Sequence, residues 1–386
     1  MELNALLEIP GLLDDRQREV IETVISCGGV RSAAKKLGIN HSAVFRTVDR
    51  AKKRAARFGH APGHFNDGVA PGYKMGKVTI QRGPNGVERV WERQSPEQDT
   101  LAILREAVEA MAQEITPTHA IFPPLTSLSS LLTLYTFTDF HLGALAWRKE
   151  GGADWDTKIA ENTGIAAMRA LVMGAPQSGR AIVNIQGDML HTDGLQAMTP
   201  TSGHMLDADS RFGKVVQVAI RLIRHLVAEA LSKHAHVTLL ICEGNHDIVS
   251  SIWLRNLFAA LYEKEPRITV HNSELPYYAI RHGKVMLGFH HGHMKKNDDL
   301  PGLFAAQFRK MWGECEKVAI HTGHRHHRES KEHAGAEVIQ HPTIAARDAY
   351  AARGGWMAER RMTAITYHEE HGEVGTVTVC PEMLSV

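Results

Sequence analysis

Five apolar runs in this sequence each end in Asp, Asn or His, and this recurrence constrains the fold more than any other feature. The runs are LLTLYTFTDFH, AIVNIQGDML, VTLLICEGNHD, KVMLGFHHGH and VAIHTGHRHH. Amphipathic helices are expected between the first three, at about 156–173 and 213–234. Apolar runs of this kind suit strands that are buried on both faces of a sheet. The pattern therefore predicts an α/β layered domain.

The polar residues at the ends of these runs are expected to meet. Open α/β sheets bind ligands just beyond the carboxyl ends of their strands. Mixed nitrogen and oxygen donors suit Mn²⁺, Fe²⁺ or Zn²⁺ better than Ca²⁺, and a bridging aspartate can hold two ions roughly 3.5–4 Å apart, as in two-metal hydrolases. The residues expected around one crevice are Asp139, His141, Asp188, Asn245, His246, His291, His324 and His326.

The order of these motifs resembles the signature of the calcineurin-like metallophosphoesterases, over roughly residues 132–328. The motifs are Asp139-Phe-His141, Gly187-Asp188, Gly244-Asn245-His246-Asp247, His291-Gly-His293 and Gly323-His324-Arg-His326. The resemblance implies layered, β-sandwich-like sheets flanked by helices. It also implies two divalent metal ions, with Mn²⁺ as the first expectation and Fe²⁺, Zn²⁺ or Ni²⁺ as alternatives.

The family's roles transfer to this chain position by position. The resemblance implies that Asp139, His141 and His326 hold the first metal, that Asp188 bridges the pair, and that Asn245, His291 and His324 hold the second. His246 would not bind metal. It would act on the phosphate as the catalytic general acid or by stabilising charge.

Several further histidines lie close to these motifs. In FHHGH, His291 is chosen as the ligand because the family's ligand precedes Gly-His, and strand alternation then turns His290 away. The same alternation argues against His327. His191, in GDMLH, and His293 are candidates for contact with the substrate, although a loop histidine is an equal reading of His191. Asp348, Tyr350 and Trp356 are expected mainly to pack in the core and loops, with lining of the cleft as the alternative.

The N-terminal region predicts a small all-α domain. Three apolar stripes at helical spacing lie within residues 15–58, the third formed by Val44, Phe45 and Val48. Ala34, Gly38 and Val44 stand at the spacing of a helix-turn-helix, in which the glycine adopts a positive φ in the turn. The segment resembles the helix-turn-helix units of recombinases and small regulators.

A basic face accompanies this module, since nine Lys or Arg residues and one acid lie from Arg31 to Arg57. Exposed residues near the start of the last helix would meet base edges in a major groove, and later cations would meet phosphates. The predicted nucleic-acid contacts are Ser42, Arg46, Arg50, Lys52, Lys53 and Arg54. The alternative is a basic, solvated helix that packs in a small bundle.

Composition sets the wider frame. The 386 residues divide into a predicted helix-turn-helix domain (1–60), a linker with a β-hairpin around GPNG and a helix (61–115), and a catalytic domain (116–386). No apolar run approaches the roughly 20 residues that cross a bilayer. Four scattered cysteines without a C-x-x-C pair favour a reducing compartment, hence the cytoplasm. Helix-turn-helix modules and this hydrolase class both often dimerise, so a homodimer is compatible.

A nucleic-acid-binding module joined to a phosphoesterase site predicts one substrate for both. The sequence is interpreted as a metal-dependent phosphodiesterase or nuclease that acts on nucleic acid, DNA in the first instance, and its catalytic motifs resemble those of double-strand-break repair nucleases. One alternative is a phosphatase or cyclic-nucleotide phosphodiesterase with an unrelated regulatory helix-turn-helix. A second is a non-catalytic DNA-binding protein.

Overall fold

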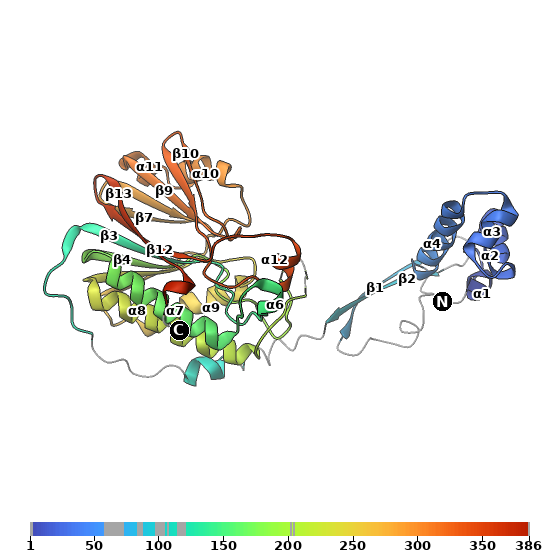
Figure 1. The fold of residues 1–386 in the computed structure, drawn as a ribbon, viewed down its shortest axis with the longest axis horizontal. Helices are drawn as coiled ribbons and strands as arrows, with labels where there is room; N and C mark the ends of the chain where they lie inside the picture. The colour runs from blue at the N-terminus through green and yellow to red at the C-terminus, as the bar shows by residue number, and fades with distance from the viewer. Residues whose placement is uncertain are drawn as a thin grey trace. The chain divides into compact units, whose positions relative to one another are not determined.

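The chain forms two compact units, Met1–Asp99 and Thr100–Val386 (Figure 1). The computed structural model describes residues 3–57, 73–82, 88–96, 105, 108–113, 121–200, 203 and 205–384. The expected linker segment 58–72 and the expected GPNG turn therefore lie outside the described residues.

Four helices and a hairpin make up the described part of the N-terminal unit. A capping box starts the second helix, because Asp14 accepts from the backbone of Gln17 and the Gln17 side chain accepts in return. Gly38, at φ 65°, ends the third helix in the left-handed conformation that glycine adopts without strain. The helices are α1 (Leu3–Leu7), α2 (Asp15–Ser26), α3 (Val30–Leu37) and α4 (His41–Arg57).

The core of these helices follows the predicted stripes with one exception. Val44, Val48, Ala51 and Ala55 recur at intervals of three or four residues and bury one face of α4. Phe45, predicted as part of that stripe, is 62% exposed. One residue advances a helix by about 100°, which carries Phe45 off the buried face. The prediction for this side chain was wrong.

The expected hairpin is confirmed. Strand β1 (Tyr73–Arg82) pairs antiparallel with β2 (Glu88–Pro96), so that Arg82 lies opposite Glu88 and Tyr73 lies opposite Pro96. Residues 108–113 are helical, within the helix expected from about 96 to 115.

A six-stranded sheet forms the centre of the C-terminal unit, in the order β13-β12-β3-β4-β5-β6. Four strands run parallel: β3 (Leu128–Phe137), β4 (Ser178–Ile185), β5 (His236–Ile241) and β6 (Ile268–His271). The C-terminal strands β12 (Met362–His368) and β13 (Gly372–Val379) extend it antiparallel beside β3.

A second sheet has five strands in the order β10-β11-β9-β8-β7. Its three central strands run parallel and its two edge strands pair antiparallel. The strands are β7 (Tyr278–His282), β8 (Val285–Phe289), β9 (Lys317–Thr322), β10 (Glu329–His333) and β11 (Ala336–Gln340). Together the two sheets and their helices make a mixed α/β fold.

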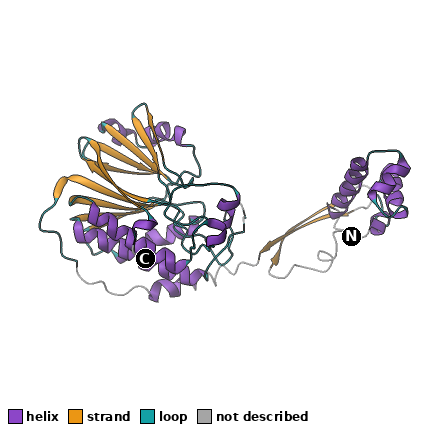
Figure 2. Ribbon diagram, in the orientation of Figure 1, coloured by secondary structure: helices purple, strands orange, loops and turns teal. Residues whose placement is uncertain are grey.

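Helices cover the outer face of each sheet (Figure 2). The six-stranded sheet packs on α7 (Thr157–Gly174), α8 (Phe212–Lys233) and α9 (Ile248–Leu261), of which α7 and α8 lie close to the two helices expected from the sequence. The five-stranded sheet packs on α10 (Leu300–Gln307) and α11 (Arg309–Glu314). Short helices complete the unit: α6 (Arg148–Gly151), α12 (Ala349–Arg353), η1 (Asn297–Asp299) and η2 (Pro381–Met383).

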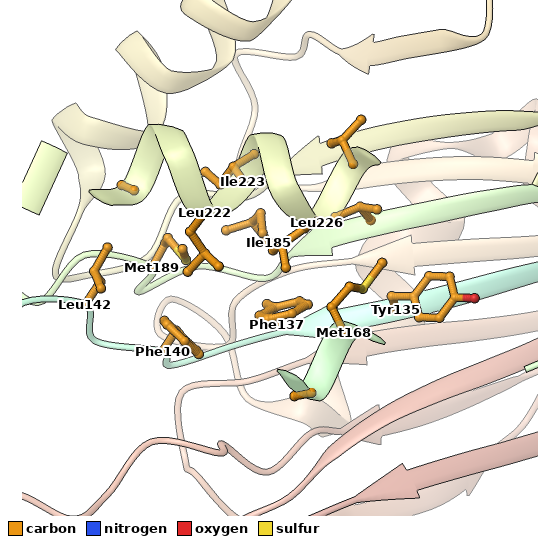
Figure 3. Close-up of a cluster of buried hydrophobic side chains, with 14 of the residues drawn as sticks. Tyr135, Phe137, Phe140, Leu142, Met168, Ile185, Met189, Leu222, Ile223 and Leu226 are labelled. Carbon is orange, nitrogen blue, oxygen red and sulfur yellow. The ribbon is translucent and has the colours of Figure 1, made fainter. Parts of the chain in front are cut away.

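Strand β3 shows why apolar residues occur at both odd and even positions of its sequence. Alternate side chains of a strand point to opposite faces. Leu132 and Leu134 pack between the two sheets, whereas Tyr135 and Phe137 belong to the cluster that lies between the sheet and its helices (Figure 3). From Leu132 to Phe137 the strand is buried on both faces, Thr133 and Thr136 included, and the predicted ligands follow its end. Among the described helices, none is long and apolar enough to cross a membrane.

Candidate metal centre

Five strands of the two sheets end at the candidate site. Parallel strands that lie side by side bring their carboxyl ends to one edge, here β3, β4 and β5 in one sheet and β8 and β9 in the other. Each predicted metal ligand follows one of these strands within a few residues: Asp139 and His141, Asp188, Asn245, His291, and His324 and His326.

The first ligand group joins the end of β3 to the end of β9. One potential ligand atom from each of Asp139, His141 and His326 lies within 4.8 Å of the other two. Nε2 of His326 is 3.1 Å from Oδ1 of Asp139 and 3.4 Å from Nε2 of His141. These are the three side chains that the resemblance assigns to the first metal.

The second group joins β4, β8 and β9. Ligand atoms of Asp188, His291 and His324 lie within 4.8 Å of one another. Nε2 of His291 is 3.1 Å from Oδ2 of Asp188 and 3.9 Å from Oδ1 of Asp139. The two groups are therefore neighbours, as a pair of bridged metals requires.

Asn245, the remaining predicted ligand, lies beside Asp188. Its neighbour Gly244 is packed so closely that a Cβ there would overlap Oδ1 and the backbone nitrogen of Asp188. Oδ1 of Asn245 is buried and has no hydrogen-bond partner among the described residues. The amide oxygen is thus free to bind a ligand, and its place at the second group stays a prediction.

The unsatisfied atoms test whether these side chains fit metal ions. Buried side-chain atoms that make no acceptable hydrogen bond to a described residue include Oδ1 of Asp139, Oδ1 of Asn245 and Nε2 of His291. Two of these atoms, Oδ1 of Asp139 and Nε2 of His291, lie 3.1 Å from an ion-pair partner, and divalent cations would give all three a ligand bond. The mixture of carboxylate, amide and imidazole donors suits borderline metals. The donor set fits a pair of divalent ions.

Backbone strain is concentrated at the same positions. Of the described residues other than glycine, five have a positive φ: Asp139 (48°), His141 (47°), Asp188 (53°), His324 (70°) and His326 (60°). Each such residue costs of order 1–3 kcal/mol and persists only where its surroundings hold it. All five are predicted ligands, so the strained turns are what directs these side chains inward.

Charge in the site is balanced between carboxylates and histidines. Burial acts to raise the pKa of Asp139, but His326 and His291 outweigh it and hold that pKa below its ordinary value. Burial opposes ionisation of Asp188 too, yet the adjacent His291 keeps its pKa well below the ordinary value. Against burial, Asp188 and Asp139 raise the pKa of His291 to about 10. Two charged, buried carboxylates need positive charge beside them. Bound metal ions would supply this charge, and the histidines would lose their protons when they bind the metal.

The predicted non-ligand His246 lies against the first group. Its ring centroid is 4.7 Å from that of His141, and its backbone nitrogen donates to Oδ1 of Asp188 over 2.8 Å. Nδ1 lies 2.9 Å from the carbonyl oxygen of His191. A carbonyl oxygen only accepts hydrogen bonds, so Nδ1 carries the proton in this one. Nε2 is therefore free to contact another group.

His191 and His293 flank the two groups. Nδ1 of His191 is 3.4 Å from Nδ1 of His141, and a ligand atom of His191 lies within 4.8 Å of atoms of His141 and His246. Burial, followed by the charge of His246, lowers the pKa of His191 to about 4. The His293 ring is 5.4 Å from that of His291. Contact with the substrate stays a prediction for both.

His290 and His327, which are not predicted as metal ligands, make other contacts. Nδ1 of His290 is 3.0 Å from the carbonyl oxygen of Pro276, and the ring lies 4.7 Å from that of Tyr277. His327 is exposed, and its Nδ1 is 2.9 Å from the carbonyl oxygen of Arg325.

Two supporting aspartates were given no role from the sequence. Asp247 accepts backbone hydrogen bonds from Asp188, Met189, Leu190 and Gly244 at 2.7–3.2 Å. Asp193 accepts from the backbone nitrogens of Val249 and Ser250, both at 2.7 Å, and so caps α9. Asp247 belongs to the GNHD motif, and its place in that motif could have indicated a role in the site. Nothing local marks Asp193, because its partners are 56 and 57 residues away.

The predicted nucleic-acid contacts all lie on α4 in the N-terminal unit. Ser42, Arg46, Arg50, Lys52 and Arg54 are exposed, and the side chain of Lys53 lies outside the described set. An open hollow of about 580 Å³ at the start of the helix is lined by Val30, Arg31, His41, Ser42, Phe45 and Arg46. The exposed Phe45 therefore shares its surface with cations.

No protein-family model matches the chain, and no curated protein matches it. Solved structures give weak overlaps. A conserved uncharacterised protein, described as a predicted phosphoesterase, from Streptococcus pneumoniae TIGR4 is 11% identical, with 64% of this chain and 97% of that chain covered and a TM-score of 0.27. Vps29 from Entamoeba histolytica, complexed with zinc, is 14% identical (64% and 98% covered, TM-score 0.26). Phosphopantetheinyl hydrolase from Mycobacterium tuberculosis is 11% identical (60% and 94% covered, TM-score 0.27). Overlaps with scores this low do not bear on the function of this chain.

Proposed function

We propose that this protein is a metal-dependent phosphodiesterase that hydrolyses nucleic-acid phosphodiester bonds, with DNA as its substrate. One observation carries the proposal: the two ligand groups are adjacent, since Nε2 of His291 lies 3.1 Å from Asp188 and 3.9 Å from Asp139. Two carboxylates shared in this way are the arrangement that holds a pair of cations.

Each predicted side chain has a task in this reaction. Asp139, His141 and His326 would hold one cation, Asn245, His291 and His324 the other, and Asp188 both. Bound cations of this kind lower the pKa of water and stabilise charge on the attacking and leaving oxygens. The cations are two divalent ions, with Mn²⁺ proposed first.

His246 is proposed as the general acid. Its Nδ1 hydrogen bond to the His191 carbonyl fixes the ring, so Nε2 is the atom that would give a proton to the leaving oxygen. The backbone hydrogen bond from His246 to Asp188 holds the residue at the edge of the ligand groups. We propose that a group in this position protonates the substrate, although ligand atoms of His141, His191 and His246 also lie within 4.8 Å of one another and could hold a metal.

The N-terminal helices support the choice of nucleic acid. Helix α4 exposes arginines and lysines along its length, and such a face binds a phosphate backbone. We propose that α3 and α4 act as a helix-turn-helix that docks on duplex DNA. A homodimer is compatible with this proposal.

The rival function is hydrolysis of small phosphate esters or cyclic nucleotides. It is favoured by the fact that every predicted ligand lies in the C-terminal unit, which contains the whole site by itself. A panel of duplex DNA, single-stranded DNA, RNA, cyclic nucleotides and a generic diester, each with Mn²⁺, Mg²⁺ or chelator, separates the two. Degradation of DNA with Mn²⁺ is expected. Cleavage of small esters alone would favour the rival, and no cleavage at all would contradict both.

A further inference from the structure

Three aromatic side chains are exposed on or beside two short helices of the C-terminal unit, α6 and α12. Trp147, Tyr350 and Trp356 are 55%, 66% and 57% exposed, respectively. Packing in the core and loops is the main expectation for Tyr350 and Trp356; their exposure excludes the core, whereas the two rings do contact each other. Large apolar side chains that gather on a surface mark a place where something binds. We refer to these three residues as the aromatic wall.

The wall is built on two short helices that pack together, α6 and α12, which lie side by side in Figure 1. Trp147 is the N-cap of α6 and accepts a backbone hydrogen bond from Gly151. Arg347 joins the parts, since its guanidinium donates to the carbonyl oxygens of Gly151 (3.1 Å) and Trp356 (3.4 Å). The rings of Tyr350 and Trp356 meet edge to face at 5.2 Å. The rings thus stand on one rigid support.

Two segments of the chain connect this support to the ligand groups. On one side, Trp147 follows the predicted ligand His141 by six residues. On the other side, the hydroxyl of Thr343 donates to the carbonyl oxygen of Asp139 over 2.7 Å, shortly before α12 begins. Asp348, the N-cap of α12, is also one of the charges that act on His191. The segments that carry the wall are therefore tied to the ligand groups at His141 and Asp139.

Two cations accompany the rings. Nζ of Lys149 lies 5.1 Å from the centroid of the Trp147 ring, in a cation–π arrangement. Among the described residues, neither Lys149 nor Arg347 forms an ion pair, whereas Arg148 pairs with Asp154 and Arg353 with Glu150. The surface thus offers flat aromatic faces together with two positive charges that no described carboxylate neutralises.

We infer that the aromatic wall binds the unpaired bases of single-stranded nucleic acid and leads that strand to the metal centre. The inference rests on the proposed function and names its substrate class. Bases stack on aromatic rings while cations meet the phosphates. A duplex hides the faces of its bases, so this surface selects a single strand or an unwound end. A partner with aliphatic side chains would gain nothing from planar rings, whereas bases stack on them.

The experiment measures strand binding by the full chain with chelator present, so that nothing is cleaved. The background variant carries Arg50, Lys52, Lys53 and Arg54 all changed to Ala, which removes the cations of α4 from the measurement. The probes are a fluorescein-labelled oligothymidine strand and an abasic strand of the same length and charge. Fluorescence anisotropy gives Kd for each pair.

Stacking contributes about 1–3 kcal/mol per base, so Trp147→Leu and Trp356→Leu should each raise Kd for oligothymidine about tenfold. Trp147→Phe and Trp356→Phe should keep most of the affinity, because phenylalanine retains a planar ring. The matched control Met173→Ala removes an exposed apolar side chain near the last turn of α7 and should change nothing. The abasic strand should bind weakly to every variant.

Three results would overturn the inference: Leu variants that bind like the parent, an abasic strand that binds as tightly as oligothymidine, or sedimentation showing that the Leu changes break a dimer. Hydrolysis of bis(4-nitrophenyl) phosphate with Mn²⁺ keeps the two proposals apart. If the parent cleaves this diester while the Leu changes leave binding intact, only the wall is misassigned. If the parent cleaves nothing while the Leu changes weaken strand binding, the proposed function fails, but the inference that the aromatic wall binds single strands is retained.

Discussion

The backbone nitrogen of His324 donates a hydrogen bond to Oδ2 of Asp139 over 2.8 Å, although 185 residues separate the two. Both residues have a positive φ. The contact holds the turn after β9 against the turn after β3, and so joins the two sheets where their predicted ligands meet.

This contact depends on the absence of a side chain at Gly323. A Cβ there would overlap Oγ1 of Thr138 and lie 2.7 Å from Oδ2 of Asp139. Gly323→Ala should therefore separate the turns and lower Mn²⁺ affinity at least tenfold, as measured by calorimetry. Gly302→Ala is the control, because nothing lies within 4 Å of that position in α10, and alanine should stabilise the helix by about 0.5–1 kcal/mol. Equal metal affinity in both variants would contradict the role of Gly323.

Asp188→Asn should abolish activity and remove bound metal. Asparagine keeps an oxygen that can accept the hydrogen bond from the backbone of His246, but it lacks the negative charge that both cations share. Metal content by elemental analysis and diester hydrolysis are the measurements. Asp298→Asn, an exposed carboxylate that pairs with Lys331, is the control. A variant that retains two metals per chain would exclude Asp188 as the bridge.

His246→Ala should retain metal and lose turnover. A general acid contributes roughly 10²–10⁴-fold to kcat. The loss should be smaller for a 4-nitrophenyl ester, whose leaving group needs little protonation, than for an alkyl ester or DNA. His327→Ala, an exposed histidine beside the predicted ligand His326, should leave kcat unchanged. Loss of metal from the His246 variant would instead make that residue a ligand.

Four changes on α4 should weaken binding to duplex DNA. Replacing Arg50, Lys52, Lys53 and Arg54 with Ala removes cations that would meet phosphates. The slope of log K against log salt should fall by about one for each phosphate that is no longer neutralised. The matched control replaces four exposed cations of the C-terminal unit, namely Lys158, Lys264, Arg309 and Lys310. If only the control weakens binding, the duplex docks elsewhere.

His234 should make stability depend on pH. Nε2 of His234 lies 2.7 Å from the Tyr135 hydroxyl, and Nδ1 lies 2.9 Å from the carbonyl oxygen of Ser178, a pattern that a neutral ring satisfies. Burial lowers its pKa to about 4. The folded state thus disfavours the charged ring, so its contribution is complete above the unfolded pKa of about 6.5 and is lost as pH falls towards 4.

Between about pH 7.5 and about pH 5, this residue alone should cost about 2 kcal/mol of unfolding free energy. Urea denaturation with chelator, compared between the parent and His234→Gln, isolates the effect. The variant should be less stable at neutral pH and should lose less stability on acidification. Parallel pH profiles would show that His234 is not the titrating group.

The sequence predicted the layered fold and which side chains meet, because an apolar run followed by a polar residue marks both a buried strand and its end. It did not predict Asp193 or Thr343, whose partners are fixed only when distant strands come together. Edge strands such as β10 were missed because they are short and largely polar. Phe45 was misplaced because its neighbour Val44 fits the apolar stripe equally well, and a shift of one residue decides which of the two is buried.

Asp247 accepts hydrogen bonds from the loops after both β4 and β5. The two oxygens of one buried carboxylate thereby join these two loops to each other, which favours their moving together. We therefore expect a substrate to reach the ligand groups without separation of the loops after β4 and β5.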